Sequence, residues 1–134
     1  MKIRFAGEED LAFLSSHDGH ISAEILRERV AQECVYIAEE NGAPVGWLRY
    51  NLFWDNTPFC NLIFVSEKAR GRGVGGALLA AWERGMRAAG YSVVMTSTQA
   101  REQAQMFFRT NGYADAGGFF PHGEGYELVL LKVL

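Results

Sequence analysis

The sequence predicts an α/β domain in which a mixed, mostly antiparallel sheet of about seven strands is combined with about four helices. Three observations lead to this prediction. Two strand-like runs are joined by the hairpin signal Asn41-Gly42, helical periodicity occurs between strand-like runs on both sides of that hairpin, and a further pair of strand-like runs closes the chain. Hairpins give antiparallel pairs, whereas a helix between two strands allows a parallel one.

Length and composition limit the classes of function. The chain has 134 residues, 49% of them hydrophobic and 22% charged, which is typical of a single globular domain over residues 1–134. Thirteen basic and 16 acidic residues give a net charge of −3, so no overall field attracts nucleic acid or an anionic membrane. The polar amino terminus and the lack of a long apolar stretch predict a cytoplasmic protein without signal peptide or membrane span.

The two cysteines, Cys34 and Cys60, lie in apolar stretches. Neither has another Cys or His at metal-ligand spacing, so the sequence predicts no metal site and no disulfide framework.

The first third of the chain predicts one strand and two helices. Lys2–Ala6 alternates polar and apolar residues like a half-buried strand, and Glu8–Glu33 is rich in helical periodicity. His17–Gly19 divides that region into two helices. Ser22 is available to cap the second one.

A hairpin and a buried strand follow. Val35–Ala38 and Val45–Phe53 are predicted antiparallel strands around Asn41-Gly42. After the turn-rich stretch Trp54–Pro58, the apolar run Phe59–Val65 is typical of a central strand buried on both faces.

The second half alternates helices and strands. Apolar residues recur every four positions from Val74 to Ala89, which predicts an amphipathic helix ended by Gly90. The remaining predicted elements are a core strand at Tyr91–Met95, a helix at Arg101–Asn111, and a final pair of strands at Tyr113–Phe120 and Tyr126–Leu134.

A glycine cluster at residues 70–76, R-G-R-G-V-G-G, lies between a predicted strand and a predicted helix. A helix start offers unpaired N–H groups and the positive end of a dipole, and glycines let phosphate oxygens approach the backbone. A tight turn is the simpler alternative, but four glycines in six residues with two interleaved arginines favour an anion site. A dinucleotide fold would need an acidic residue where Thr96-Ser97-Thr98 stands, and a P-loop would need Gly-Lys followed by Ser or Thr.

Two motifs resemble the GCN5-related N-acetyltransferase (GNAT) family. R-x-x-G-x-G at residues 70–75 is similar to the family signature Q/R-x-x-G-x-G/A, and A-x-x-F-F-x-x-x-G-Y at residues 104–113 is similar to A-x-x-F-Y-x-x-x-G-F/Y. The resemblance extends from about Ile37 to the carboxyl terminus and includes a bacterial subgroup with the segments W-D-N-T-P and M-T-S-T-Q. It implies the GNAT acyl-CoA N-acyltransferase fold, with acetyl-CoA as cosubstrate and no metal.

The resemblance also implies a cofactor site. Its residues are Phe64, Val65, Arg70, Gly71, Arg72, Gly73, Val74, Gly75, Gly76, Arg101, Phe107 and Phe108. The N–H of Val65 is implied as the donor to the developing oxyanion. Two positions depart from the family pattern: the tyrosine thought to protonate the leaving thiolate falls on Phe108, and a cofactor-binding asparagine falls on Arg101.

Candidate catalytic side chains are few. Asp55, Glu67 and Glu127 are the carboxylates expected near a substrate cleft, and Asp55 is singled out because Trp54 beside it offers a ring face to a cationic amine. Each is also compatible with a solvated surface charge. Tyr113 is a hydroxyl donor that would replace the missing acid.

The sequence therefore predicts transfer of acetyl from acetyl-CoA to a primary amine, with a small molecule as the expected acceptor, by direct attack in a ternary complex. Two alternatives stay open. One is an acyl-CoA-binding sensor or interaction module with weak catalysis, which Phe108 favours, and the other is a protein N-terminal or lysine acetyltransferase. Dimers are common in the family, and the sequence specifies neither the acceptor nor the oligomeric state.

Overall fold

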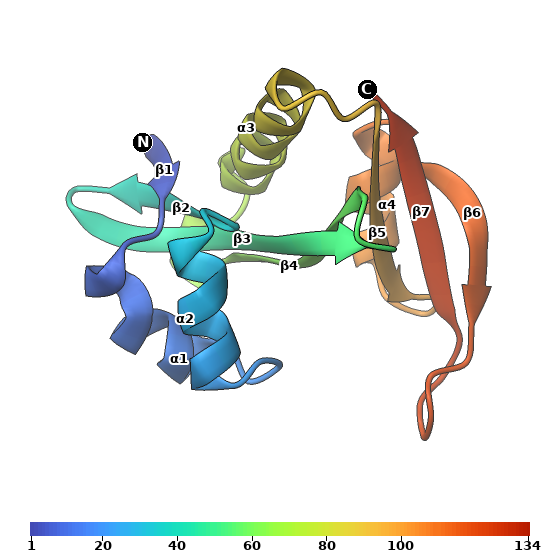
Figure 1. Cartoon of the computed structure of the whole chain (residues 1–134), viewed down its shortest axis with the longest axis horizontal. Coiled ribbons are helices and arrows are strands. Elements are labelled where there is room, and N and C mark those ends of the chain that lie inside the picture. Colours follow the sequence, from blue (N-terminus) through green and yellow to red (C-terminus); the bar gives the residue numbers. More distant parts are fainter. The chain divides into compact units, whose positions relative to one another are not determined.

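The computed structural model describes residues 1–134 and contains a seven-stranded sheet with the strand order β1-β2-β3-β4-β5-β7-β6 (Figure 1). The strands are β1 (Lys2–Phe5), β2 (Val35–Glu40), β3 (Ala43–Phe53), β4 (Thr57–Val65), β5 (Val93–Gln99), β6 (Ala114–Phe119) and β7 (Glu127–Val133). The α-helices are α1 (Leu11–His17), α2 (Ala23–Ala31), α3 (Val74–Ala88) and α4 (Ala104–Thr110), with short 3₁₀ turns η1 (Glu8–Asp10) and η2 (Glu67–Ala69).

The pairing of the strands confirms the predicted fold class. β4 and β5 run parallel, whereas β1–β2, β2–β3, β5–β7 and β6–β7 are antiparallel. The sheet is thus mixed and mostly antiparallel. None of the helices is long and apolar enough to span a membrane.

The chain divides into two compact units. The first comprises Met1–Asn51 and Leu62–Trp82, and the second comprises Leu52–Asn61 and Glu83–Leu134. β3, β4 and α3 therefore contribute residues to both units.

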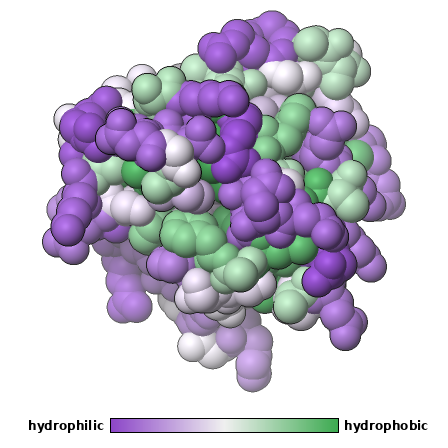
Figure 2. All heavy atoms as spheres, turned by 90° about the vertical axis from the view of Figure 1, so that its left-hand side faces the viewer, coloured by the Kyte–Doolittle hydropathy of each residue, from purple (hydrophilic) through white to green (hydrophobic).

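Helices cover both faces of the strands in the first unit (Figure 1). α1 and α2 bury Leu14 and Leu26 in a core with Trp47 of β3, whose ring lies 5.5 Å from that of Phe13. Strand side chains alternate between faces, and the opposite face carries Tyr50, whose ring is 5.8 Å from that of Trp82 on α3. The outer surface seen in Figure 2 is mostly hydrophilic, with smaller hydrophobic areas.

Local signals set the start of the first unit. The predicted break between two helices is confirmed: α1 ends at His17, α2 begins at Ala23, and the hydroxyl of Ser22 accepts a hydrogen bond of 3.2 Å from the N–H of Ile25. This satisfies one of the helix's unpaired N–H groups, as an N-cap does.

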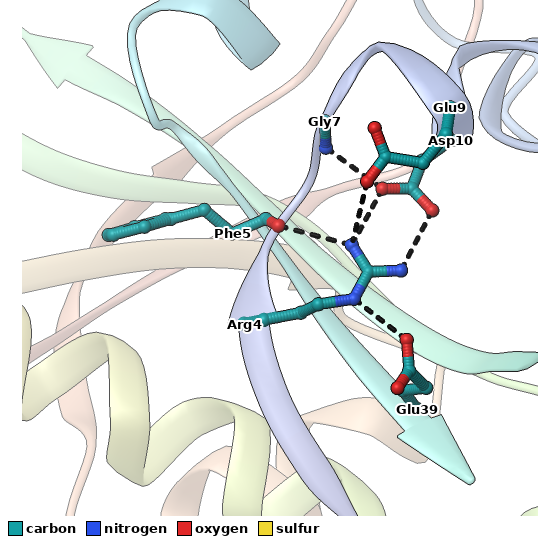
Figure 3. Close-up of polar contacts among 6 residues, drawn as sticks. All are labelled: Arg4, Phe5, Gly7, Glu9, Asp10 and Glu39. Carbon is teal, nitrogen blue, oxygen red and sulfur yellow. Dashed lines mark hydrogen bonds and ion pairs between the residues drawn. The ribbon is translucent and has the colours of Figure 1, made fainter. Parts of the chain in front are cut away.

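Two polar clusters that the sequence did not reveal hold this unit together. Arg4 donates to both carboxylate oxygens of Asp10, at 2.7 and 3.0 Å, and its Nε lies 2.8 Å from Glu39 (Figure 3). The Arg4 hydrogen bonds hold the pKa of Asp10 below its usual value. Arg49 of β3 donates to buried Asp18, just after α1, at 2.9 Å. Each cluster joins segments that are distant in sequence.

The second unit is built on β5, which pairs with β4 and with β7. The hydroxyl of Thr96 donates to the carbonyl of Cys60 at 2.9 Å, across the parallel pair. Val94 and Leu130 lie in the core of this unit. β6 is the edge strand, and all six of its residues are exposed.

Two strands differ from the prediction. In β4 only Pro58 and Cys60 are buried, so the strand is not buried on both faces. A short apolar run does not distinguish a fully buried strand from a half-buried one with apolar residues on its outer side. β5 begins at Val93 rather than Tyr91 and continues to Gln99, because β7 pairs with it along that whole length.

Candidate functional site

The glycine loop opens a space at the start of α3. Gly71 and Gly73 have φ angles of 76° and 81°, a left-handed conformation that costs glycine little. A Cβ built on Gly71, Gly73 or Gly76 meets no atom within 4 Å. The backbone of these three glycines is therefore open on the side where a Cβ would stand.

The same loop presents hydrogen-bond donors. The first helical bond of α3 runs from the N–H of Ala77 to the carbonyl of Gly73, at 3.0 Å. The N–H groups of Val74, Gly75 and Gly76 therefore have no acceptor within the helix. Three such donors at the positive end of a 15-residue helix fit an anion such as a pyrophosphate.

The two arginines of the loop are engaged by the protein itself. Arg70 donates from Nε to the carbonyl of Val65 at 2.9 Å, and its guanidinium lies 5.7 Å from the ring centre of Phe64. Arg72 forms a 2.6 Å ion pair with Glu40 at the end of β2. Glu40 therefore offsets the charge of Arg72 that the sequence assigned to the anion site.

Three of the predicted cofactor residues come together at the end of β4. The ring of Phe64 is close to two side chains: the guanidinium of Arg70 and the ring of Trp47, whose centre is 4.7 Å away. The N–H of Ser66 donates to the carbonyl of Val45 at 2.8 Å. The peptide of Val65 is thus held by Arg70 at its carbonyl and by strand pairing next to it, immediately before the loop.

Gly46 of β3 is a positioning residue that sequence analysis missed. A Cβ there would lie 2.7 Å from the carbonyl oxygen of Phe64 and 3.3 to 3.4 Å from the side chains of Leu78 and Val74 on α3. Only glycine allows β3, the end of β4 and the start of α3 to approach this closely. A lone glycine inside a strand-like run is the sequence signal for such an approach.

The second signature lies in the second unit. Phe108 of α4 is buried, and its ring packs edge-on against those of Phe107 and Tyr113, with centroids 5.2 and 5.4 Å away. The hydroxyl of Tyr113 donates to Glu83 at 2.7 Å. Burial and the Glu83 carboxylate raise the pKa of Tyr113 well above its usual value, which makes this phenol a poorer acid and favours a packing role.

Glu83 completes a buried polar cluster with Tyr113 and Lys132, whose Nζ lies 2.9 Å from the other carboxylate oxygen. Sequence analysis missed this cluster. The available signal was the position of Glu83 four residues after Leu79, on the apolar side of α3.

The remaining candidates take no part in these contacts. Asp55, in the turn between β3 and β4, is exposed and makes no hydrogen bond or ion pair. Glu127 is half-buried at the start of β7, opposite Gln99 and Phe119. Arg101 and Glu67 are exposed. No group of three or more His, Cys, Asp or Glu residues is arranged to hold a metal ion.

Comparisons with known proteins agree with this arrangement. The family described as Acetyltransferase (GNAT) domain matches residues 31–115. No curated protein matches by sequence.

Solved acetyltransferases share the fold. A ribosomal-protein-alanine N-acetyltransferase from Brucella melitensis is 22% identical, with a TM-score of 0.82 and all of both chains covered. A chain of the NatC complex bound to Gag peptide and CoA is 19% identical, with a TM-score of 0.82 over 100% of this chain and 99% of that one. A streptothricin acetyltransferase from Bacillus anthracis, described as putative and solved with acetyl coenzyme A, is 22% identical, with a TM-score of 0.69 over 75% and 61% of the two chains.

Proposed function

Because the chain belongs to the GNAT family and is an acetyl-CoA-dependent N-acetyltransferase, we propose that it acetylates the primary amine of a small molecule by direct attack in a ternary complex. The observation that supports this most is the glycine loop, in which three N–H groups at the start of α3 have no acceptor within the helix and the Cβ positions of Gly71, Gly73 and Gly76 are open. Acetyl-CoA supplies the thioester. The chain supplies its binding and orientation.

The proposed roles follow from the geometry of the loop. Val74, Gly75 and Gly76 hold pyrophosphate oxygens through their N–H groups. Arg70 holds the carbonyl of Val65. The N–H of Val65, in the preceding peptide group, is the donor that the family resemblance implies for the oxygen that becomes negative when the amine attacks. Arg72, paired with Glu40, shapes the loop.

Proton transfer is assigned to solvent. The attacking amine must be uncharged, and water takes up the proton that the amine releases. Phe108 has no proton to donate, so the thiolate leaves as the anion. A thiol with a pKa of about 8.5, as in cysteine, makes this leaving group tolerable near neutral pH.

The loop assignment is tested at Gly76. Its backbone has an ordinary φ, and a Cβ there meets nothing within 4 Å. Gly76→Ala should raise the stability of the ligand-free protein by about 0.5–1 kcal/mol, because alanine favours a helix, yet it should lower the affinity for acetyl-CoA. Gly76→Val should lower that affinity by about tenfold or more. Calorimetry and thermal melts measure both effects.

Gly19→Ala is the matched control, since its Cβ is equally unopposed and its φ is ordinary. It should leave acetyl-CoA affinity unchanged. An unchanged affinity in folded Gly76→Val would refute the loop assignment.

The sensor alternative rests on Phe108, which stands where the family has its acid and is buried here. Thiol release from acetyl-CoA across a panel of primary amines separates the two functions. Turnover with any amine well above hydrolysis supports the enzyme, and tight acetyl-CoA binding without turnover supports the sensor.

A further inference from the structure

Arg72, in the middle of the glycine loop, is tied to the sheet by an ion pair. Its Nη2 lies 2.6 Å from Oε1 of Glu40, the last residue of β2. The two side chains differ in exposure, because that of Glu40 is 23% exposed and that of Arg72 is 53% exposed. The carboxylate is therefore the anchored partner, and the loop is the part that the pair holds.

The backbone on both sides of Arg72 is flexible by composition. Gly71 and Gly73 have φ angles of 76° and 81°, and a Cβ at either position meets nothing within 4 Å. Glycine loses more conformational freedom on folding than any other residue. The ion pair with Glu40 therefore holds the loop at the point where order costs most.

The two flanks of the loop have contacts of their own. Before the glycines, Nε of Arg70 donates to the carbonyl of Val65 at 2.9 Å. After them, Gly46 of β3 lets the start of α3 come close, since a Cβ at residue 46 would lie 3.4 Å from the side chain of Val74. Between these flanks, Arg72 joins the loop to β2.

A carboxylate has the wrong charge for a place beside an anion site. Glu40 repels phosphate and also neutralises Arg72. Repulsion between single charges across several ångströms of water changes an affinity by about twofold. Ordering one residue of a flexible loop beforehand is worth about tenfold. The benefit from an ordered loop therefore exceeds the loss from repulsion.

We propose that Glu40 is a positioning residue for the cofactor, which holds the loop in its binding shape through Arg72 before acetyl-CoA arrives. The N–H groups of Val74, Gly75 and Gly76 then need less ordering when they bind pyrophosphate. This inference rests on the proposed use of the loop for acetyl-CoA. It has an unusual consequence: removal of a negative charge beside the site weakens the binding of a polyanion.

Two substitutions of Glu40 should give a graded effect. Glu40→Ala removes the acceptor for Arg72, and we expect it to raise the Kd of acetyl-CoA in calorimetry by about fivefold. Glu40→Gln removes the charge but keeps an oxygen that accepts a hydrogen bond, so the Kd should rise by only about twofold. Glu8→Ala, which breaks an exposed pair with Arg27 in the same unit, should leave it unchanged. Tighter binding in Glu40→Ala would overturn the proposal.

An exchange of the two charges separates positioning from direct contact with phosphate. Arg72→Glu brings two carboxylates together and Glu40→Arg brings two guanidinium groups together, so each should weaken acetyl-CoA binding. The double variant re-forms the pair in reverse and should bind more tightly than either single variant. If Arg72 held phosphate itself, Glu40→Arg would bind most tightly of the three, and the proposal would fall.

Trypsin measures the order of the loop without the cofactor, because it cleaves after Arg70 and Arg72 when the loop opens. Ligand-free Glu40→Ala should be cut there about fivefold faster than the wild-type protein, and Glu8→Ala at the wild-type rate. An unchanged rate in Glu40→Ala would contradict the positioning role.

Failure of this inference differs from failure of the loop assignment on which it rests. If Gly76→Val weakens acetyl-CoA binding and Glu40→Ala does not, the loop binds the cofactor but Glu40 does not position it. If neither substitution changes the affinity, the loop assignment falls and this inference falls with it.

Discussion

Two hairpin turns in this protein share one backbone conformation and differ in the residues that adopt it. Between β2 and β3, Asn41 and Gly42 have φ angles of 52° and 78°; between β3 and β4, Trp54 and Asp55 have 56° and 61°. The first pair is the preferred sequence for such a turn. In the second pair the conformation disfavours Trp54, whereas Asp55 tolerates it.

The charged side chains near the two turns also differ, because those near the first turn are paired. Glu39 and Glu40, just before the first turn, form ion pairs with Arg4 and Arg72. Asp55 in the second turn has no partner, and Trp54 is exposed to solvent. The comparison teaches that the first hairpin is built for stability, whereas the second gives up stability to keep an indole and a carboxylate at the surface.

The largest expected effect on stability concerns Arg4, which forms ion pairs with Asp10 and Glu39 near the first hairpin. Arg4→Ala leaves buried Asp10 and half-buried Glu39 without their shared cation, and we expect it to cost about 3 kcal/mol of unfolding free energy. Chemical denaturation measures this. Arg27→Ala, which breaks an exposed pair with Glu8, should change stability by no more than about 0.5 kcal/mol. Equal losses of unfolding free energy in both variants would contradict the stabilising role of the Arg4 ion pairs.

Exchanging the sequences of the two turns tests directly whether their residues determine the stability of each hairpin. Asn41→Trp combined with Gly42→Asp places disfavoured residues in the first turn, where a Cβ at residue 42 meets nothing within 4 Å. We expect a loss of about 2 kcal/mol from the backbone alone. Trp54→Asn combined with Asp55→Gly should instead raise the melting temperature. If the two exchanges had effects of the same sign, the second turn would not be strained.

A single substitution measures the contribution of Gly42 to the stability of the first turn. Gly42→Ala should cost about 1 kcal/mol, because its φ of 78° disfavours a Cβ although space is free. Gly125→Ala, with equal space and an ordinary φ, should leave stability unchanged or slightly higher. Thermal melts of both variants decide the point.

The smallest expected effect on stability near neutral pH comes from the protonation of Asp10. Arg4 lowers the pKa of Asp10 in the folded protein, so its contribution is complete above the unfolded pKa of about 3.9 and is lost as the pH falls through the lower folded value. Asp10→Asn should flatten stability between about pH 4 and pH 2. Chemical denaturation between about pH 2 and pH 7 measures this, and a profile for Asp10→Asn as steep as that of the wild-type protein would contradict the role of the Arg4 pair.

Sequence was a good guide where a structure depends on neighbouring residues. Asn41-Gly42 predicted a hairpin, Ser22 predicted a helix cap, and the glycines between Arg70 and Gly76 predicted a loop that presents backbone N–H groups; the structure has each of these features. Each depends on the conformational preference of a few adjacent residues.

Sequence was a poor guide where partners are far apart in the chain. Arg49 meets Asp18 across 31 positions, and Lys132 meets Glu83 across 49. The length of β5 was set by its partner β7, not by its own apolar residues. The left-handed turn at Trp54 opposes its local preference, so it was visible only in the backbone angles.

The three tryptophans give the protein a built-in optical probe. Trp47 and Trp82 are 1% and 0% exposed, whereas Trp54 is 79% exposed. A collisional quencher dissolved in water reaches only the indole of Trp54, so quenchable emission reports on the second turn and unquenchable emission on the interior of the first unit. A titration followed in both components distinguishes a ligand that covers the turn from one that alters the fold, without any label.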